Sequence, residues 1–177
     1  MRPGTLTVRG ARRDELDEIS DLLVRAYAEL EERFYWRGAW NMYLADVADV
    51  HGRWGQSRLV VAELDGALVG SVDYYGPDSG GYRYPGLAFP PGWSCFRCLG
   101  TDPDHRGIGA GRALVEHLIA LARGDGASHL ALHSAPIMET AMRMYGRLGF
   151  RRLPEHDFSP RPDSPHKVLA FGLPLSP

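Results

Sequence analysis

The most informative stretch of this sequence is residues 99–112, which read LGTDPDHRGIGAGR. The residues at 93–101 have the apolar pattern of a strand, and those at 112–123 have the spacing of an amphipathic helix. Alternating glycines in the connection leave no side chain over the backbone N–H groups at the helix start. Free N–H groups at a helix N-terminus bind anions, so the stretch favours a phosphate site over a mere connector.

Two other phosphate-binding motifs fit this glycine pattern poorly. A Walker loop needs GxxxxGK[ST], but the only lysine of the chain is Lys167. A dinucleotide fingerprint, GxGxxG, needs an acidic residue about 20 positions further on, whereas residues 130–132 are apolar. The predicted antiparallel hairpin before the loop also argues against a dinucleotide fold.

Residues 99–111 resemble the acyl-CoA loop of the GCN5-related N-acetyltransferases, usually called GNAT proteins. The motif of that family is Arg or Gln, two residues, Gly, one residue, Gly or Ala, and Arg106, Gly109 and Gly111 occupy these positions. Residues 141–150, AMRMYGRLGF, resemble the second motif of the family, in which an aromatic helix face ends at Leu-Gly-Phe. Two motifs in the right order make the resemblance specific.

The resemblance implies an α/β (mixed α+β) GNAT fold with one central, twisted, mostly antiparallel sheet of six to seven strands. About four helices flank the sheet, which splays between its fourth and fifth strands. We expect one domain over residues 1–177, because this length is typical of a single core. Residues 34–57 and 76–92 have no recognisable family pattern. The predicted elements are strands 6–9, 58–64, 67–75, 93–101, 129–133 and 167–173, and helices 16–30, 39–50, 112–123 and 136–148.

The resemblance also implies which residues bind and react. The backbone of two residues at the end of the fourth strand would pair with the pantetheine arm of acetyl-CoA, and the N–H groups of the loop would hold its pyrophosphate. Tyr145 lies where the family keeps a tyrosine near the thioester sulfur, and a phenol with a pKa near 10 can protonate a departing thiolate. A core tyrosine is the alternative. The expected cofactor-binding residues are Leu99, Thr101, Arg106, Gly107, Ile108, Gly109, Ala110, Gly111 and Arg112.

Two features depart from the family pattern. Met138 stands where many members have an asparagine, seven positions before the tyrosine. Strand 93–101 has no Asp or Glu, although that strand often supplies the general base. Asp73 and His133 are the candidates for a base. The alternatives are a partly buried Asp73 that backbone donors satisfy and a solvated surface His133. Aromatic residues in or beside the loop at 76–92 could line an acceptor pocket or pack on the sheet: Tyr74, Tyr75, Tyr82, Tyr84, Phe89 and Trp93.

Composition limits the other possibilities. The chain is 44% hydrophobic and 24% charged, with a formal net charge of -2, which offers no basic field for nucleic acid or an anionic membrane. Residues 1–17 are charged, and no stretch approaches the roughly 20 apolar residues of a membrane span, so we expect a cytoplasmic protein. Cys95 and Cys98 form a lone CxxC, but strand geometry points their sulfurs to opposite faces, so we expect no metal site.

Together these observations predict a cytoplasmic N-acetyltransferase that moves an acetyl group from acetyl-CoA to a primary amine by direct attack in a ternary complex. The expected partners are acetyl-CoA and an amine acceptor, without nucleic acid, membrane or metal, and a homodimer is left open. The sequence does not select the acceptor. Two alternatives are a non-catalytic acyl-CoA-binding regulatory module, which the missing carboxylate favours, and a dinucleotide-binding oxidoreductase.

Overall fold

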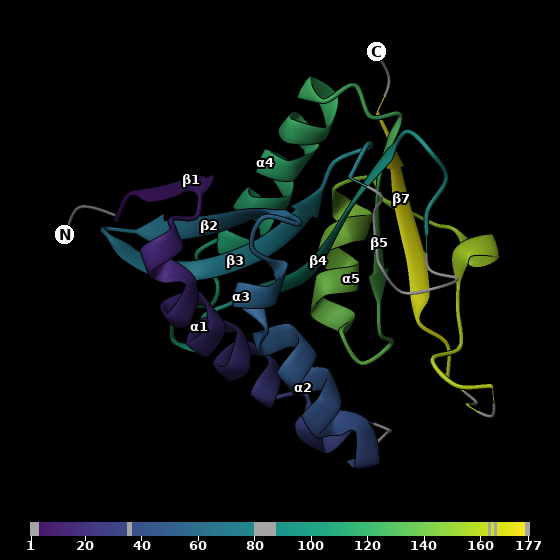
Figure 1. Ribbon diagram of the computed structural model, residues 1–177, viewed down its shortest axis with the longest axis horizontal. Coiled ribbons are helices and arrows are strands. Elements are labelled where there is room, and N and C mark those ends of the chain that lie inside the picture. The colour runs from purple at the N-terminus through teal and green to yellow at the C-terminus, as the bar shows by residue number, and fades with distance from the viewer. Residues whose placement is uncertain (1–3, 35–36, 80–87, 163, 165, 176–177) are drawn as a thin grey trace. The chain divides into compact units, whose positions relative to one another are not determined.

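The computed structural model describes residues 4–34, 37–79, 88–162, 164 and 166–175. They form a mixed α/β fold with five α-helices and seven strands in one sheet, in the order β1-β2-β3-β4-β5-β7-β6 (Figure 1). The predicted fold class is therefore confirmed. The elements are β1 (Leu6–Gly10), α1 (Leu16–Ala28), α2 (Trp40–Ala48), α3 (Val50–Arg53), β2 (Arg58–Leu64), β3 (Ala67–Tyr75), β4 (Trp93–Thr101), α4 (Ala110–Gly124), β5 (His129–Ser134), α5 (Glu139–Arg147), β6 (Arg151–Arg152) and β7 (Leu169–Pro174).

Most predicted elements are present, and three strands, β2, β3 and β4, have the predicted bounds. The helix predicted at 39–50 is present as α2, but it ends at Ala48 because the backbone turns at Asp49, where ψ is 58°, before the short helix α3. The Asp49 carboxylate accepts the Gly52 N–H at 3.0 Å and so starts the second helix. The helix predicted from residue 136 begins at Glu139, and β6 was not predicted. Residues 80–87, in the predicted long loop, lie outside the described residues.

The chain divides into two compact units. The first comprises Met1–Tyr74 and Cys98–Leu118, and the second comprises Tyr75–Arg97 and Ile119–Pro177. Strand β4 and helix α4 each contribute residues to both units. The single domain expected over residues 1–177 stays a prediction, and each unit is described below by itself.

The first unit contains the predicted hairpin. Asp65 and Gly66 connect β2 to β3 with φ angles of 49° and 92°, which are left-handed values of the kind that a tight two-residue hairpin turn needs. Strand β1 pairs antiparallel with β2, and β2 pairs antiparallel with β3. Figure 1 shows these three strands side by side. The Asp-Gly turn therefore sets the pairs next to it, Leu64↔Ala67 and Glu63↔Leu68, and a bulge between Ala62 and Glu63 shifts the register beyond them.

Two glycines of the first unit allow helices to approach the sheet closely. A Cβ atom at Gly100 of β4 would lie 2.7 Å from Cδ2 of Leu23 on α1, which is closer than real Cβ contacts come. A Cβ atom at Gly70 of β3 would lie 3.0 Å from Cδ1 of Leu114 on α4. Because α1 and the first turns of α4 are seated at these glycines, the connection between β4 and α4 starts and ends on fixed elements.

Helix α4 has the amphipathic pattern that the sequence predicted. Leu114, Leu118 and Ala122 recur at helical spacing and are fully buried, whereas Glu116 is exposed. Gly126, with φ of 73°, follows the helix in the left-handed conformation typical of a helix stop. At 15 residues α4 exceeds the other described helices, and none of them combines the length and apolar character that crossing a bilayer requires.

The second unit contains the other half of the sheet. Strand β4 runs parallel to β5, and their pairing extends from Trp93↔His129 to Phe96↔Leu132. Strand β5 also pairs antiparallel with β7, and this ladder continues two residues further, to Ser134. Figure 1 shows β5 beside β7. The early end of the β4–β5 ladder agrees with the predicted splay between the fourth and fifth strands.

Candidate functional site

The glycine loop between β4 and α4 has the backbone of an anion cradle. Gly107 and Gly109 have φ angles of 80° and 85°, which residues with a Cβ atom rarely adopt. A Cβ built at either position would meet no atom within 4 Å, so the space above the loop is open. These glycines are therefore required by backbone conformation, and their bare backbone faces room for a ligand.

The start of α4 supplies hydrogen-bond donors to this loop. The first bond of the helix runs from the Ala113 N–H to the Gly109 carbonyl at 2.9 Å. The N–H groups of Ala110, Gly111 and Arg112 come before it and have no acceptor inside the helix. The positive end of the helix dipole adds to these donors, so this terminus suits a phosphate group.

Two arginines of the predicted motif flank the loop, and both form ion pairs. Arg106 binds Glu29, directly after α1, and the Arg112 Nε lies 2.8 Å from Glu116 Oε1, one helical turn further along α4. All four side chains are largely exposed, so they can exchange partners in solvent. The pairing of Arg106 with Glu29 had no signal in the sequence, because the two residues lie far apart in the chain.

A buried carboxylate fixes the entry into the loop. Asp102 accepts the Asp104 N–H at 3.0 Å and the Arg25 guanidinium at 3.2 Å. Burial alone would raise the pKa of Asp102, but the Asp104 N–H and the positive charge of Arg25 outweigh it and hold the pKa below its ordinary value. Asp102 therefore stays ionised and anchors the turn between β4 and the glycines.

The end of β4 carries a backbone irregularity that the sequence did not reveal. Cys98 has a φ of 52°, a left-handed value that costs a non-glycine residue about 1–2 kcal/mol. Leu99 and Thr101, the residues expected to pair with pantetheine, follow it and lie past the last β4–β5 pair, Phe96↔Leu132. The backbone N–H and carbonyl groups of Leu99 and Thr101 are thus not part of the β4–β5 ladder.

Tyr27 supports the same segment from α1. Its hydroxyl donates a hydrogen bond to the Leu99 carbonyl at 3.2 Å, which leaves the second lone pair of that oxygen for another donor.

The two cysteines of the predicted CxxC, Cys95 and Cys98, are both buried, and neither forms a disulfide.

Tyr145 lies in the second unit, on the buried face of α5. Its ring packs against Phe96 and Phe150, both with a centroid distance of 5.8 Å, and against Phe171 at 6.4 Å. Only 4% of the residue is exposed, and burial raises its pKa above the ordinary value, so the phenol keeps its proton at neutral pH. A protonated phenol suits both predicted roles, the general acid and the core tyrosine.

Asp73 has a structural explanation. Its carboxylate is 1% exposed, accepts the Arg53 Nε–H at 2.9 Å through one oxygen, and accepts the Ser57 hydroxyl at 2.6 Å through the other. Arg53 also donates to the Val47 carbonyl at 2.8 Å. The pair joins the helices α2 and α3 to β3, so this carboxylate acts as a buried anchor.

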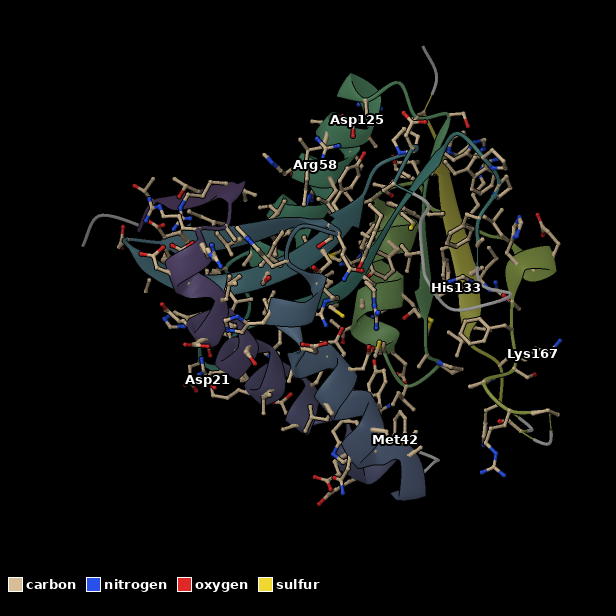
Figure 2. All side chains as sticks on the ribbon, in the orientation of Figure 1. Asp21, Met42, Arg58, Asp125, His133 and Lys167 are labelled. Carbon is tan, nitrogen blue, oxygen red and sulfur yellow. The ribbon has the colours of Figure 1, made fainter. Side chains whose placement is uncertain are left out.

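His133 belongs to an aromatic cluster of the second unit. Its ring stacks on Phe89 at 4.6 Å and meets Phe158 edge-on at 5.1 Å, and Figure 2 labels it on β5. Nε2 lies 2.9 Å from the His156 carbonyl oxygen and must donate, because a carbonyl only accepts. Burial lowers the pKa of His133, so the imidazole is neutral at pH 7. The side chain is half-buried, which is less exposed than the alternative of a solvated surface histidine predicts.

The predicted aromatic set does not form one described group. Phe89 and Trp93 stack at 6.0 Å beside His133 in the second unit. Tyr74 is fully buried in the first unit under the Arg58 guanidinium, and Tyr75 is also buried. Tyr82 and Tyr84 lie outside the described residues.

The predicted cofactor-binding residues and Tyr145 fall in different units. Every residue from Leu99 to Arg112 belongs to the first unit, whereas Tyr145 and His133 belong to the second. The structure thus brings the loop residues together around one strand-to-helix connection. It gives Tyr145 a separate setting, among aromatic side chains.

The mixed sheet and the glycine-rich connection from β4 to α4 make this chain an α/β protein with a candidate anion site at a helix N-terminus. Within that class the chain belongs to the acetyltransferase (GNAT) family, whose family model matches residues 16–150. An uncharacterised N-acetyltransferase from Methanocaldococcus jannaschii is 26% identical over 155 residues, which are 82% of this chain and 61% of the relative. The chain therefore spans less than two thirds of that relative's length.

Solved structures show the same fold. The histone acetyltransferase HPA2 and related acetyltransferase from Corynebacterium glutamicum is similar at a TM-score of 0.71 and 25% identity, covering 98% of each chain. A putative acetyltransferase from Salmonella typhimurium, solved with its cofactor acetyl-CoA, is similar at a TM-score of 0.67 and 19% identity, covering 98% of this chain and 95% of that one.

Proposed function

We propose that this chain is an N-acetyltransferase that moves an acetyl group from acetyl-CoA to a primary amine by direct attack in a ternary complex. The observation that carries the proposal is the open glycine loop, where Gly107 and Gly109 adopt positive φ before the free N–H groups of α4. Membership of the acetyltransferase (GNAT) family supports it, as does the acetyl-CoA bound in the similar Salmonella structure.

In this proposal the first unit binds the cofactor. The N–H groups from Gly107 to Arg112 hold the pyrophosphate, and Arg106 adds positive charge beside them. The backbone of Leu99 and Thr101 pairs with the pantetheine amides. The exposed ion pair of Arg106 with Glu29 must loosen for the guanidinium to turn to the phosphate, which its solvent exposure permits.

The chemical step needs one acid and one base. The amine nitrogen attacks the thioester carbonyl, the carbon–sulfur bond breaks, and the departing thiolate takes the proton of the Tyr145 hydroxyl; the phenolate then recovers a proton from solvent. The products are the amide and free CoA. Of the two base candidates Asp73 is engaged by Arg53 and Ser57, so we assign the role to His133, whose lowered pKa keeps it neutral. The proton reaches it directly or through water.

A thiol-release assay with acetyl-CoA over a panel of amines tests this function. We expect turnover with at least one class among small amines, amino acids, aminoglycosides, polyamines and peptide N-termini. Binding of acetyl-CoA without turnover on any amine would support the regulatory module, and absence of binding would end the proposal. We also propose the cytoplasm as the location, which fractionation of the source cells tests.

A further inference from the structure

A buried hydroxyl at the end of β5 has no hydrogen-bond partner among the described residues. Ser134 is 3% exposed, and its Oγ reaches neither a donor nor an acceptor in the described part of the chain. Burying a hydroxyl without a partner is unfavourable, and an alanine at this position would avoid the loss. An unsatisfied buried hydroxyl needs an explanation, and a ligand that supplies the missing partner is one.

The register of the sheet places this hydroxyl on the same face as Tyr145. Leu132 of β5 pairs with Phe96 of β4 and with Phe171 of β7, and the Tyr145 ring packs on both phenylalanines, at 5.8 and 6.4 Å. Side chains two residues apart on a strand share a face, about 6.6 Å apart. Ser134 is therefore the next side chain along β5 on the face that Tyr145 covers.

Ser134 also lies just past the point where β5 leaves β4. The β4–β5 ladder ends at Phe96↔Leu132, while Ser134 still pairs with Leu169 on the β7 side. On the β4 side, the backbone of Ser134 therefore lies beyond the last residue pair of the ladder. A ligand group can thus approach this end of β5 without displacing a β4–β5 backbone pair.

We propose that the Ser134 hydroxyl donates a hydrogen bond to the acyl carbonyl oxygen of the bound acyl-CoA. This assignment rests on the proposed function, in which Tyr145 serves the sulfur of the same thioester. Attack by the amine places negative charge on the carbonyl oxygen, and a donor that is already in position and shielded from water stabilises that charge. Ser134 would then contact the reacting group and contribute to catalysis directly.

Ser71 offers a matched control. It is a β3 residue of the first unit, 0% exposed, and its Oγ also has no partner among the described residues. Both Ser134→Ala and Ser71→Ala remove an unsatisfied buried hydroxyl, so neither variant should lower Tm. Only Ser134→Ala should lower kcat/KM for acetyl transfer, by about 10²- to 10³-fold.

Binding measurements distinguish the contact to the acyl carbonyl from contacts to the rest of the ligand. We expect Ser134→Ala to weaken binding of acetyl-CoA while leaving CoA, which lacks the acyl carbonyl, unchanged, as measured by calorimetric titration. Equal weakening for both ligands, no change for either, or a loss equal to that in Ser71→Ala would overturn the proposal, as would a fall in Tm that accounts for the loss. If the wild type binds acetyl-CoA but turns over no amine, the proposed function fails, and the titration still tests Ser134.

Discussion

The candidate groups at the start of α4 are backbone groups, whereas those in the region of β5 and α5 are side chains. At the start of α4 the candidate functional element is the backbone: glycines at positive φ, with open space where their Cβ atoms would stand, and N–H groups that have no acceptor inside the helix. In β5 and α5 the candidate groups are side chains, of which Tyr145 and Ser134 are buried and His133 is half-buried. A backbone site can be recognised from glycine spacing, whereas a side-chain site depends on register and burial.

The largest effect on catalysis is expected from Tyr145→Phe, which removes only one hydroxyl from the region of β5 and α5. If that hydroxyl protonates the thiolate, kcat falls by about 10² to 10⁴ with little change in acetyl-CoA affinity. Steady-state kinetics with a saturating amine, together with a binding titration, measure both quantities. Tyr74→Phe removes another buried hydroxyl, in the first unit, and should leave kcat unchanged. A kcat within twofold of wild type in Tyr145→Phe would make Tyr145 a core residue.

Asp73→Asn tests whether the buried Asp73 carboxylate acts as the general base or only as a structural anchor. The change leaves the Arg53 guanidinium buried without its ionic partner, and breaking such a pair costs about 3–5 kcal/mol of unfolding free energy. Urea denaturation should show this loss, while kcat measured at low temperature on folded protein stays near wild type. Glu63→Gln, at a half-buried pair with Arg9, should cost far less. A lost kcat with intact stability would instead make Asp73 the base.

Gly109→Val tests the backbone site. The branched side chain cannot adopt φ of 85° without strain and would stand over the free N–H groups of α4. Acetyl-CoA at a hundredfold excess over Kd should stabilise the wild type by about 2.7 kcal/mol, and the variant should lose this gain in a thermal-shift titration. Gly126→Val is the matched control, because Gly126 has φ of 73° with nothing within 4 Å but follows α4. If both variants bind normally, the loop is only a connector.

The sequence was sufficient for most elements and for the loop because these depend on local signals, whereas the arrangement of the sheet was expected from the resemblance to the GNAT family. The Asp65-Gly66 turn, the alternating glycines and the helical spacing of α4 each specify a conformation within a few residues. The pairing of Arg106 with Glu29 and the partnerless hydroxyl of Ser134 depend on contacts between distant segments. No local pattern encodes those. Even the strained Cys98 has no sequence signal, because a cysteine in a strand is expected to be extended.

His133 should make the unfolding free energy of the protein depend on pH. Burial lowers the pKa of the folded imidazole below the ordinary value of about 6.5, while nearby Asp157 opposes this shift. Below pH 6.5 the unfolded chain therefore binds more protons, and the stability present at higher pH is lost as the pH falls through the folded pKa. His133→Phe should flatten the fall in unfolding free energy below about pH 6.5. An unchanged pH profile would mean that His133 is not held neutral by the fold.

The smallest effect is expected at the exposed edge of the backbone site. Glu29 holds the Arg106 guanidinium and also repels an incoming pyrophosphate, so Glu29→Gln should tighten acetyl-CoA binding by about two- to fivefold at low salt. Glu18→Gln removes an equal charge from an exposed position of α1 and controls for net charge. Calorimetric titrations at low and high ionic strength should show that the gain of Glu29→Gln shrinks as salt rises, because both side chains are open to solvent. Weaker binding in Glu29→Gln would mean that the carboxylate positions Arg106 for the phosphate, and the ion pair would then belong to the bound state as well.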